Sequence, residues 1–255
     1  MKAASFGWVR PGSLNAASDL LRAEGACAMG GGQSLGPMLN LRVVRPTTVV
    51  PIAGLPELHG VEDEAGALTL GAATTHAAIA DGRTPDFTLG GQRVLAGIAN
   101  GIAYRAVRNR GTLGGSLCHA DPAADWLTTL MALDAVVLTT RRAVALEKFV
   151  IGPFRTMLEP GEVVRAVRIP RPALGAGWGY HKLCRKPGEF AHAMAACRAG
   201  PAPRIVIGAV GGPPIVLNHP DAAEAALSFL NPVDRRLHLV AMARALDAAQ
   251  AGMNA

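Results

Sequence analysis

The chain has 255 residues, of which half are hydrophobic and 17% are charged, so it can bury a substantial core as one large domain or two modest ones. Its formal net charge is +6, but the basic residues are spread along the chain and only 4% of residues are aromatic, which argues against a nucleic-acid stacking platform. An acidic small ligand or an acidic partner surface accounts for the charge more economically.

The first fifty residues predict a small α/β unit. A capped amphipathic helix over residues 13–25 is followed by strands at 26–29 and 47–52, with one helical turn at 37–41 between them. In such a unit, ligands bind at the edge of the sheet where the strands have their C-terminal ends, here called the ligand end.

After about residue 60 the sequence pattern is typical of antiparallel strands and no longer of an α/β unit. Residues 61–72 are typical of a hairpin that turns at Ala65-Gly66, and later short strands separated by Pro and Gly turns indicate antiparallel sheet. Residues 170–177, PRPALGAG, look like a linker into a C-terminal subdomain. The other predicted strands are 135–140, 163–169, 178–183, 191–197 and 204–210, and the other predicted helices are 92–99, 125–133, 221–230 and 233–250.

The first glycine-rich segment, GGGQSLG at residues 30–36, fits no familiar nucleotide signature. Leu35 stands where the dinucleotide fingerprint needs its third glycine, and Gly36 with Pro37 stands where a P-loop needs its lysine. Three consecutive glycines nonetheless expose backbone N–H groups, which permits close approach to a pyrophosphate, and Gln33 and Ser34 add side-chain donors. For this run alone, a tight turn without a ligand is the favoured interpretation.

A second glycine-rich segment, GTLGGS at residues 111–116, favours a ligand. Asp121 and Asp125 follow it within ten residues. Two glycine loops of donors can hold the two phosphates of an extended dinucleotide from opposite sides, while a downstream carboxylate accepts hydrogens from ribose or ribityl hydroxyls. This arrangement suits FAD. We expect valine in place of Gly114 and Gly115 to give soluble protein that lacks flavin.

Five stretches closely resemble the FAD-binding medium subunit of the molybdenum hydroxylases, a family that includes carbon monoxide dehydrogenase, xanthine dehydrogenase and bacterial N-heterocycle dehydrogenases. They are GGGQSLGPMLNLR (30–42), TTHAAIADG (74–82), IAYRAVRNRGTLGGSLCHADPAADW (102–126), LEPGEVVRAVRIP (158–170) and YHKLCRKPGEFA (180–191). The resemblance runs in order over nearly the whole chain, and residues 105–126 are its most specific block.

The resemblance implies an α+β fold of the PCMH-type FAD-binding class. Residues 1–174 would form the FAD-binding domain, with a small N-terminal α/β subdomain over about 1–55 and a larger, mainly antiparallel middle subdomain over 56–174. Residues 175–255 would form a small α+β C-terminal subdomain with antiparallel sheet and helices.

The resemblance also implies a set of cofactor-binding residues. The first loop would wrap the FAD pyrophosphate with its amides, and the second would approach the same cofactor, with Thr112 contributing its hydroxyl. Asp125 would hydrogen-bond FAD, Val164 would contact it through its backbone, and Lys182 would lie near the flavin end. The full implied set is Gly30, Gly31, Gly32, Gln33, Ser34, Leu35, Ile102, Gly111, Thr112, Leu113, Gly114, Gly115, Asp125, Val164, Lys182 and Phe190. No residue is assigned as a catalytic acid or base or as a metal ligand.

Several of these residues have simpler interpretations. Ile102 and Phe190 would flank the isoalloxazine, because a flat ring needs dispersion contacts on its faces, but Phe190 could equally be core. Asp125 could be only an N-cap or first-turn acid of a helix. Lys182, in an alternating strand, could face solvent.

Other polar residues near the motifs receive no cofactor role. His119 and Asp121 are expected to be ordinary polar residues at a strand end. His76, which begins a helix, is expected to be structural or peripheral to FAD. Glu189 departs from the family pattern, which has Asp there, so its ion-pair geometry near the flavin is expected to differ.

By this resemblance the chain is the FAD-carrying electron-transfer subunit of a heterotrimeric molybdenum hydroxylase. It would accept electrons from a small subunit with two [2Fe–2S] clusters and pass them to an external acceptor, while a large molybdenum-pterin subunit hydroxylates the substrate. The assembly is expected to be a dimer of heterotrimers. Two alternatives stay open: a nucleotide-binding scaffold or regulatory module without redox activity, and a self-sufficient flavin oxidase of the related two-loop fold. The sequence names neither the substrate nor the acceptor.

Cysteine spacing and hydropathy complete the expectations. Cys27, Cys118, Cys184 and Cys197 include no CxxC pair, which argues against a zinc site and against an iron–sulfur cluster in this chain. No run of eighteen uncharged apolar residues and no secretory signal are visible, so a cytoplasmic location without a membrane span is expected.

Overall fold

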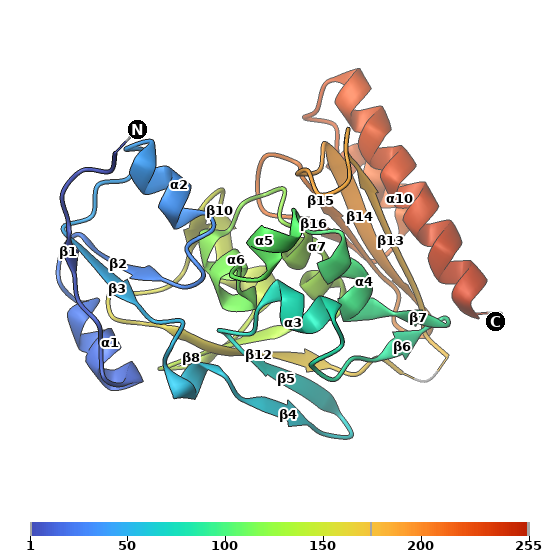
Figure 1. Cartoon of the computed structure of the whole chain (residues 1–255). Coiled ribbons are helices and arrows are strands. Elements are labelled where there is room, and N and C mark those ends of the chain that lie inside the picture. Colours follow the sequence, from blue (N-terminus) through green and yellow to red (C-terminus); the bar gives the residue numbers. More distant parts are fainter. Residues whose placement is uncertain (1, 174, 254–255) are drawn as a thin grey trace.

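Three main sheets, each with its own helices, follow one another along the part of the chain that the structure describes (Figure 1). The structure is a computed structural model, and it describes residues 2–173 and 175–253. In Figure 1 the N-terminal unit is blue, the middle unit runs from cyan to yellow, and the C-terminal unit is orange to red. The α+β fold predicted from the sequence is confirmed.

The N-terminal unit is a three-stranded parallel sheet with two short helices. Its strand order is β1 (Gly7–Trp8), β3 (Thr48–Pro51), β2 (Ala26–Met29). Helix α1 (Leu14–Leu20) begins where the Ser13 hydroxyl accepts a hydrogen bond from the Ala16 amide at 3.2 Å. The first glycine segment leaves the C-terminal end of β2 and enters α2 (Leu35–Asn40), so it lies at the predicted ligand end of the unit.

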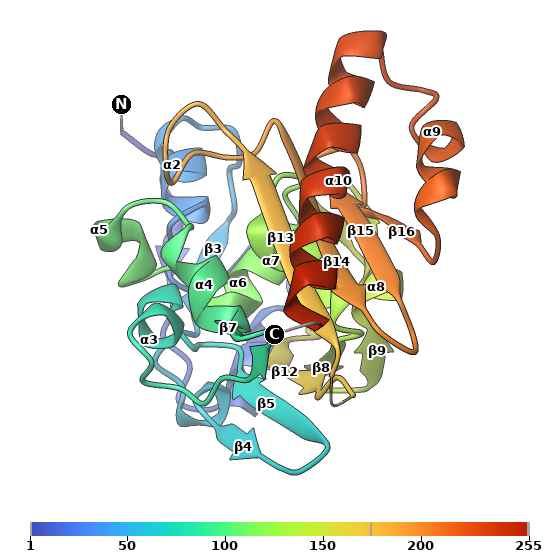
Figure 2. The same ribbon diagram turned by 90° about the vertical axis from the view of Figure 1, so that its right-hand side faces the viewer.

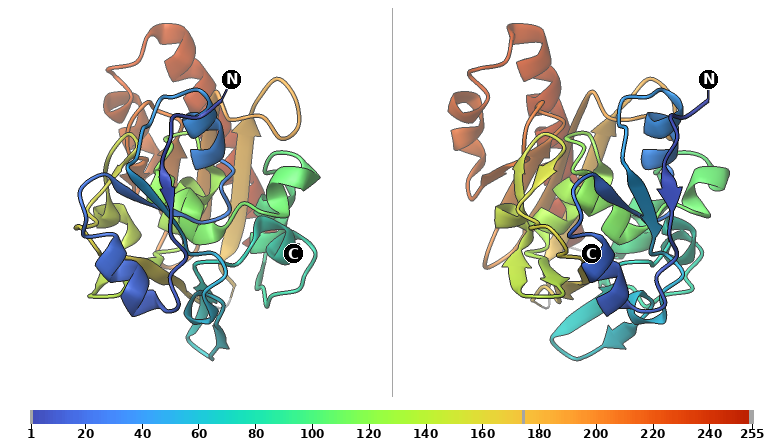
Figure 3. Two further views of the ribbon diagram at one scale, coloured as in Figure 1. Left: turned by 60° about the vertical axis from the view of Figure 1, so that its left-hand side comes forward. Right: turned by 90° about the vertical axis from the view of Figure 1, so that its left-hand side faces the viewer.

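The middle unit is built on a five-stranded antiparallel sheet. Its spatial order is β4 (Val61–Asp63), β5 (Ala67–Gly71), β12 (Val164–Pro170), β8 (Val136–Thr139), β9 (Ala143–Ala145). Its helices are α3 (His76–Ala80), α4 (Val94–Asn100), α5 (Arg105–Arg108), α6 (Leu113–His119), α7 (Asp125–Ala132) and α8 (Leu146–Phe149). Every residue of α7 is buried, because this helix packs between the middle unit and the third sheet. Figure 3 shows the N-terminal unit lying in front of the helices of the middle unit.

The C-terminal unit is a four-stranded antiparallel sheet covered by a long helix. The strands run in the order β13 (Gly177–Leu183), β14 (Ala193–Ala199), β15 (Arg204–Gly208), β16 (Ile215–Leu217). Helix α10 (Pro232–Met253) lies along one face, as Figure 2 shows, and α7 packs on β14 and β15 from the other. Strand β13 approaches α10 at backbone distance, since a Cβ at Gly177 or Gly179 would lie 1.8 Å from a helix carbonyl oxygen.

Small connecting elements fill the remaining turns. They are the 3-10 turns η1 (Pro56–Leu58) and η2 (Pro220–Ala222), the short helix α9 (Ala223–Ala226), and the two-residue or three-residue strands β6 (Thr88–Leu89), β7 (Gln92–Arg93), β10 (Val150–Gly152) and β11 (Arg155–Thr156).

Three predicted helices are clearly shorter in the structure. The helix expected over residues 13–25 ends at Leu20, and residues 21–25 form turns. The helix expected from residue 92 begins at Val94, because Gln92 and Arg93 pair with β6 in a hairpin whose turn glycines adopt positive φ. The helix expected over 221–230 is reduced to η2 and α9, since Pro220 opens a 3-10 turn rather than a regular α-helix.

The predicted linker between the second and third units contains no helix or strand at 171–173 or 175–176. Residue 174, where the sequence predicts the domain boundary, lies outside the described residues, as do residues 1, 254 and 255 of the predicted domains. The boundary therefore stays a prediction.

Candidate functional site

A cavity of about 720 Å³ lies where the three units meet. Of the sixteen residues that the resemblance implies for cofactor binding, fifteen line it. They come from both glycine segments, the connection between α4 and α5, α7, β12, β13 and the loop after β13. Leu113 is the exception: its side chain is fully buried in the core. The structure therefore brings together residues that are up to 160 positions apart in the sequence.

The first glycine segment presents an unbroken run of free amides. Within the described residues, no protein atom accepts a hydrogen bond from the backbone N–H groups of residues 30–35. The segment closes with the Gly36 amide, which donates to the Gly32 carbonyl at 2.9 Å, and Gly32 adopts φ +72°. The Gln33 side chain donates to the Gly31 carbonyl at 3.3 Å. Residues 30–35 are half-buried and line the cavity, so this run can donate to acceptor atoms of a ligand or water there.

The two glycine segments lie against each other. A Cβ at Gly31 would lie 1.8 Å from the Arg110 carbonyl oxygen, and a Cβ at Gly30 would lie 3.0 Å from Thr112 Oγ1. Only glycine at position 31 allows this approach, because a Cβ closer than 3.0 Å to backbone would force the chains apart. The predicted convergence of the two segments is therefore present in the structure.

The second segment differs from its prediction, because it is the start of α6 rather than an open loop. Its amides are already used: those of Gly111, Leu113 and Gly114 donate to the carbonyls of Val107, Thr74 and Ala72 at 2.7, 2.9 and 2.9 Å. The Gly115 amide donates to Thr112 Oγ1 at 3.1 Å, which makes Thr112 the N-cap of α6.

The glycines of the second segment have a packing role. A Cβ at Gly114 would lie 2.5 Å from the Ala72 Cβ, and one at Gly115 would lie 2.7 Å from Thr112 Oγ1. The expectation that both segments supply open amide donors is thus met by the first segment and, for these four amides, not by the second.

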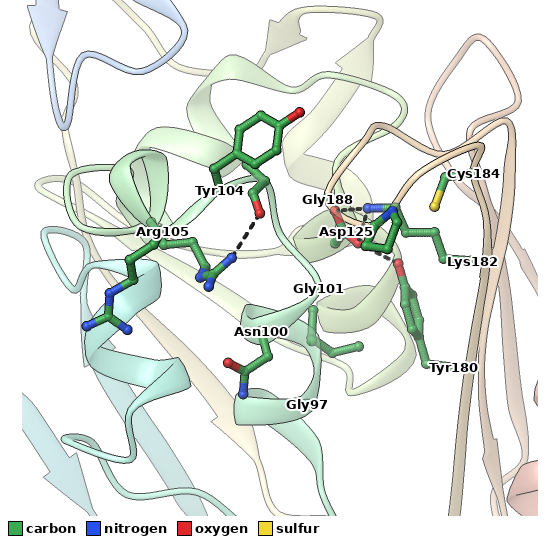
Figure 4. A pocket seen from close by; sticks show the side chains of 14 residues that line it. Gly97, Asn100, Gly101, Tyr104, Arg105, Asp125, Tyr180, Lys182, Cys184 and Gly188 are labelled. Atoms are coloured by element: carbon green, nitrogen blue, oxygen red, sulfur yellow. Dashed lines mark hydrogen bonds and ion pairs between the residues drawn. The ribbon is translucent and has the colours of Figure 1, made fainter.

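Asp125 and Lys182 form a buried ion pair, which the sequence did not predict. Lys182 Nζ lies 2.9 Å from Asp125 Oδ1 and 3.2 Å from Oδ2, with side-chain exposures of 10% and 6%. Tyr180 also donates to Asp125 Oδ1, at 2.7 Å, and Figure 4 shows both partners pointing at the carboxylate. The solvent-facing interpretation of Lys182 is therefore wrong. Of the two simpler interpretations of Asp125, the N-cap is wrong because Ala124 holds that position, whereas Asp125 is indeed an acidic residue in the first turn of α7.

Tyr180 is a site residue that the sequence analysis missed. It stands two positions from Lys182 on β13, so the strand places both side chains on one face. Burial, and then the Asp125 carboxylate, raise the pKa of Tyr180 well above its usual value, so the phenol remains a hydrogen-bond donor. The alternation of β13 was the signal that could have identified it.

Apolar and aromatic side chains from two loops form the cavity rim. Phe190 and Tyr104 are 64% and 67% exposed and both line the cavity, so Phe190 is not a core residue. Ile102 is half-buried and pairs through a single bridge with Gly188. Val164, at the start of β12, is 3% exposed and lines the wall. Tyr104 was not predicted, although it lies within the stretch 102–126 that carries the resemblance, directly before its most specific block.

Three further polar residues line the cavity. Asp121 accepts a hydrogen bond from the Ala123 amide at 2.9 Å, and the His119 ring packs against Phe154 with centroids 5.2 Å apart. His76 is buried, and its ring lies beside Trp126. The expected strand end is wrong, because His119 is the last residue of α6 and Asp121 lies in the turn before α7. The contacts themselves agree with a structural role for both residues.

A second, smaller cavity of about 520 Å³ adjoins the first. It lies between α4, α5 and the loop after β13, and Figure 4 shows it from close by. Both cavities are lined by Asp125, Lys182, Tyr104 and Gly188. The ion pair thus forms part of the wall between two cavities.

Two further observations concern metal ligands and membrane-spanning helices in residues 2–173 and 175–253. No three His, Cys, Asp or Glu side chains there are grouped closely enough to hold a metal ion. Nor does any helix in that part combine the length and apolar character that crossing a membrane requires. The four cysteines are unpaired thiols, and burial raises the pKa of Cys197 to about 12.

Three comparisons with known proteins bear on this site. Residues 4–172 match the family described as FAD binding domain in molybdopterin dehydrogenase. The chain is 36% identical over 197 residues to the 6-hydroxypseudooxynicotine dehydrogenase complex subunit alpha of Paenarthrobacter nicotinovorans. The aligned region covers 75% of this chain and 66% of that protein. The chain is also 36% identical over 199 residues to the carbon monoxide dehydrogenase medium chain of Hydrogenophaga pseudoflava, with 74% and 67% covered. A solved structure of carbon monoxide dehydrogenase from Hydrogenophaga pseudoflava superposes with a TM-score of 0.89 at 29% identity and covers 99% of both chains. The matched sequence spans about two thirds of the length of the two curated relatives.

Proposed function

Since the chain belongs to the family of the FAD binding domain in molybdopterin dehydrogenase, whose members are FAD-dependent oxidoreductase subunits, we propose that it is the electron-transfer subunit of a molybdenum hydroxylase complex. In that role it accepts electrons from a [2Fe–2S] subunit and passes them to an external acceptor. The observation that carries the proposal is the run of unpaired amides at residues 30–35 on the wall of a cavity that fifteen of the expected contact residues share.

The residues present fit FAD in three respects. The cavity volume of about 720 Å³ is within the usual range for small-molecule and cofactor sites. The free amides of the first segment suit the two phosphates, since backbone N–H groups with no side chain in the way approach anionic oxygens closely. The rim offers Ile102, Tyr104 and Phe190 as apolar and aromatic surfaces for a flat ring.

The Asp125–Lys182–Tyr180 cluster supplies the polar part of the site. Bound FAD would supply a redox group that takes up single electrons and releases pairs. The chain itself binds and orients that group. Three hydrogen bonds fix the cluster, so its charged side chains need not move when the flavin ring is reduced or oxidised. No side chain of this cluster is needed as a catalytic acid or base.

The finer parts of the proposal concern assembly and location. We expect a small subunit with two [2Fe–2S] clusters and a large molybdenum-pterin subunit as partners, in a dimer of heterotrimers in the cytoplasm. We also propose that residues 1–174 form the FAD-binding domain and residues 175–255 the C-terminal subdomain. Support comes from the relatives, which are named as a complex subunit and as a medium chain.

A visible spectrum of the purified chain tests the proposal. After addition of FAD and gel filtration we expect flavin absorption with one FAD per chain, and no such retention of FMN or NAD⁺. A folded chain that retains no FAD would overturn the proposal and favour a scaffold of the same fold. Copurification of the native complex, followed by mass spectrometry of its subunits, tests the partners separately.

A further inference from the structure

His76 is a buried histidine of the cavity wall for which the proposed function assigns no role. It is the first residue of α3, and its side chain is 6% exposed. Its Nδ1 lies 3.1 Å from Trp126 Nε1. Because an indole N–H can only donate, Nδ1 must be the bare nitrogen and Nε2 must carry the proton. The tautomer of His76 is therefore fixed by Trp126.

The Nε2 edge of His76 stays open because of the second glycine segment. A Cβ on Gly111 would lie 2.9 Å from Nε2 and 2.8 Å from Cδ2, so any side chain there would cover this edge. His76, Gly111 and Thr112 all line the large cavity. Among the described residues no acceptor receives a hydrogen bond from Nε2, so the wall holds an N–H donor without a protein partner.

The surroundings keep the imidazole neutral and fixed in position. Burial, with a smaller contribution from the Arg108 guanidinium, lowers the pKa of His76 to about 4, so the ring is uncharged near neutral pH. The His76 amide donates to the Gly111 carbonyl at 2.9 Å, which fixes the residue to the second segment. Arg108 is itself occupied, since its Nη1 donates to the carbonyls of Ile102 and Ala103, each at 2.9 Å.

We propose that His76 is a cofactor-positioning residue: its Nε2–H donates a hydrogen bond to an oxygen in the diphosphate–ribityl part of FAD, while Trp126 holds the ring in that orientation. The inference rests on the proposed function, because it requires FAD in the large cavity. It explains why Gly111 lacks a side chain although the Gly111 amide is used within the protein.

Titration of FAD into the full chain, followed by flavin fluorescence, tests the role of the donor. His76→Leu keeps an apolar side chain but removes the donor, and we expect it to weaken FAD binding about ten- to a hundredfold. His76→Gln can place an amide N–H near the Nε2 position and accept from Trp126, and we expect it to stay within about threefold of the native chain. Trp126→Phe frees the ring and should fall between the two.

The outcomes separate this inference from the proposed function. If the native chain does not bind FAD, the proposed function fails and this inference fails with it. If the native chain binds FAD while the Leu variant binds equally well, or while the Gln and Leu variants are equally weak, only the role of His76 is overturned.

Two further measurements locate the acceptor and do not depend on the Leu variant alone. Weaker binding of ADP as well as FAD by the variants would place the acceptor in the diphosphate, and weaker binding of FAD alone would place it in the ribityl chain. In the native chain labelled with ¹⁵N-histidine, the Nε2 signal that His76→Gln removes should shift on FAD addition. An unchanged signal would overturn the inference.

Discussion

The two glycine segments look alike in sequence, but their glycines have different physical roles. Residues 30–35 leave their amides without protein acceptors, so the missing side chains there expose donors. In residues 111–115 four amides are already bonded within the protein. The missing side chains let Gly111 pack against His76, let Gly114 pack against Ala72, and leave room for the Thr112 hydroxyl beside Gly115. A glycine run is therefore ambiguous in sequence: it indicates close approach, but not whether a ligand or the protein itself approaches.

A side chain at Gly114 should give the largest effect. Gly114→Val places its Cβ 2.5 Å from that of Ala72 and 2.9 Å from the Ala72 oxygen, so we expect a loss of about 3 kcal/mol or more and little soluble protein. This replaces the expectation that such a variant is soluble and merely lacks flavin. Soluble yield and urea unfolding measure it. Gly36→Ala, with no atom within 4 Å of the new Cβ, is the matched control and should be within about 1 kcal/mol of native stability. A Gly114→Val protein with native stability would contradict the conclusion that the glycines of the second segment are needed for packing.

Acid should destabilise the second segment through His76. The pKa of His76 is lowered from its ordinary value of 6.5 to about 4 in the folded chain, by burial first and by Arg108 second. Between these values the unfolded chain binds a proton that the folded chain does not, so stability is full above pH 6.5 and falls as pH drops, by roughly 1.4 kcal/mol per unit. The difference in unfolding free energy between the native chain and His76→Gln, measured from pH 7 to pH 4, isolates this contribution. A pH-independent difference would contradict it.

Gly31→Ala tests the contact between the segments. Because the new Cβ would lie 1.8 Å from the Arg110 carbonyl oxygen, the segments must separate, and we expect a loss of about 2 kcal/mol together with weaker FAD retention. Thermal unfolding and flavin content of the same preparation give both values. Unchanged stability with lost flavin would mean that Gly31 serves the ligand alone.

Thr112→Val should give the smallest effect. It removes the hydroxyl that caps α6, so we expect a loss of about 1 kcal/mol, which Thr112→Ser should restore. Chemical denaturation measures the change. A loss of FAD affinity much greater than the loss of stability would show that the second segment also binds the ligand through this hydroxyl.

Local patterns were sufficient to predict most of the fold. The cap at Ser13, the strand leading into the first glycine segment and the alternation of residues 178–183 each identify an element that the structure contains. Where the prediction failed, a pairing partner decided the outcome. Gln92 and Arg93 are strand rather than helix because β6 pairs with them, and Leu113 to Gly115 are helical because Thr112 caps them.

The candidate site was predicted as a set of residues but not as a set of interactions. Asp125 and Lys182 were each expected near FAD, yet their ion pair depends on α7 packing beside β13, which no local pattern indicates. The alternation of β13 places Tyr180 on the same face as Lys182, but it does not indicate the carboxylate that both contact. The amide bonds of the second segment depend on Ala72 and Thr74, some forty positions away.

The two faces of β13 connect the far end of the molecule to the cavity. On one face Gly177 and Gly179 touch the α10 backbone at Ala249 and Ala245, and on the other Tyr180 and Lys182 hold Asp125. At these two glycines no side chain separates strand from helix, and on the same face His181 Nε2 lies 3.2 Å from Arg244 Nη1 of α10. A displacement of the C-terminal helix is therefore expected to displace the strand that carries the lysine. Such a displacement would change the electrostatic potential at the cavity wall from the opposite side of the sheet.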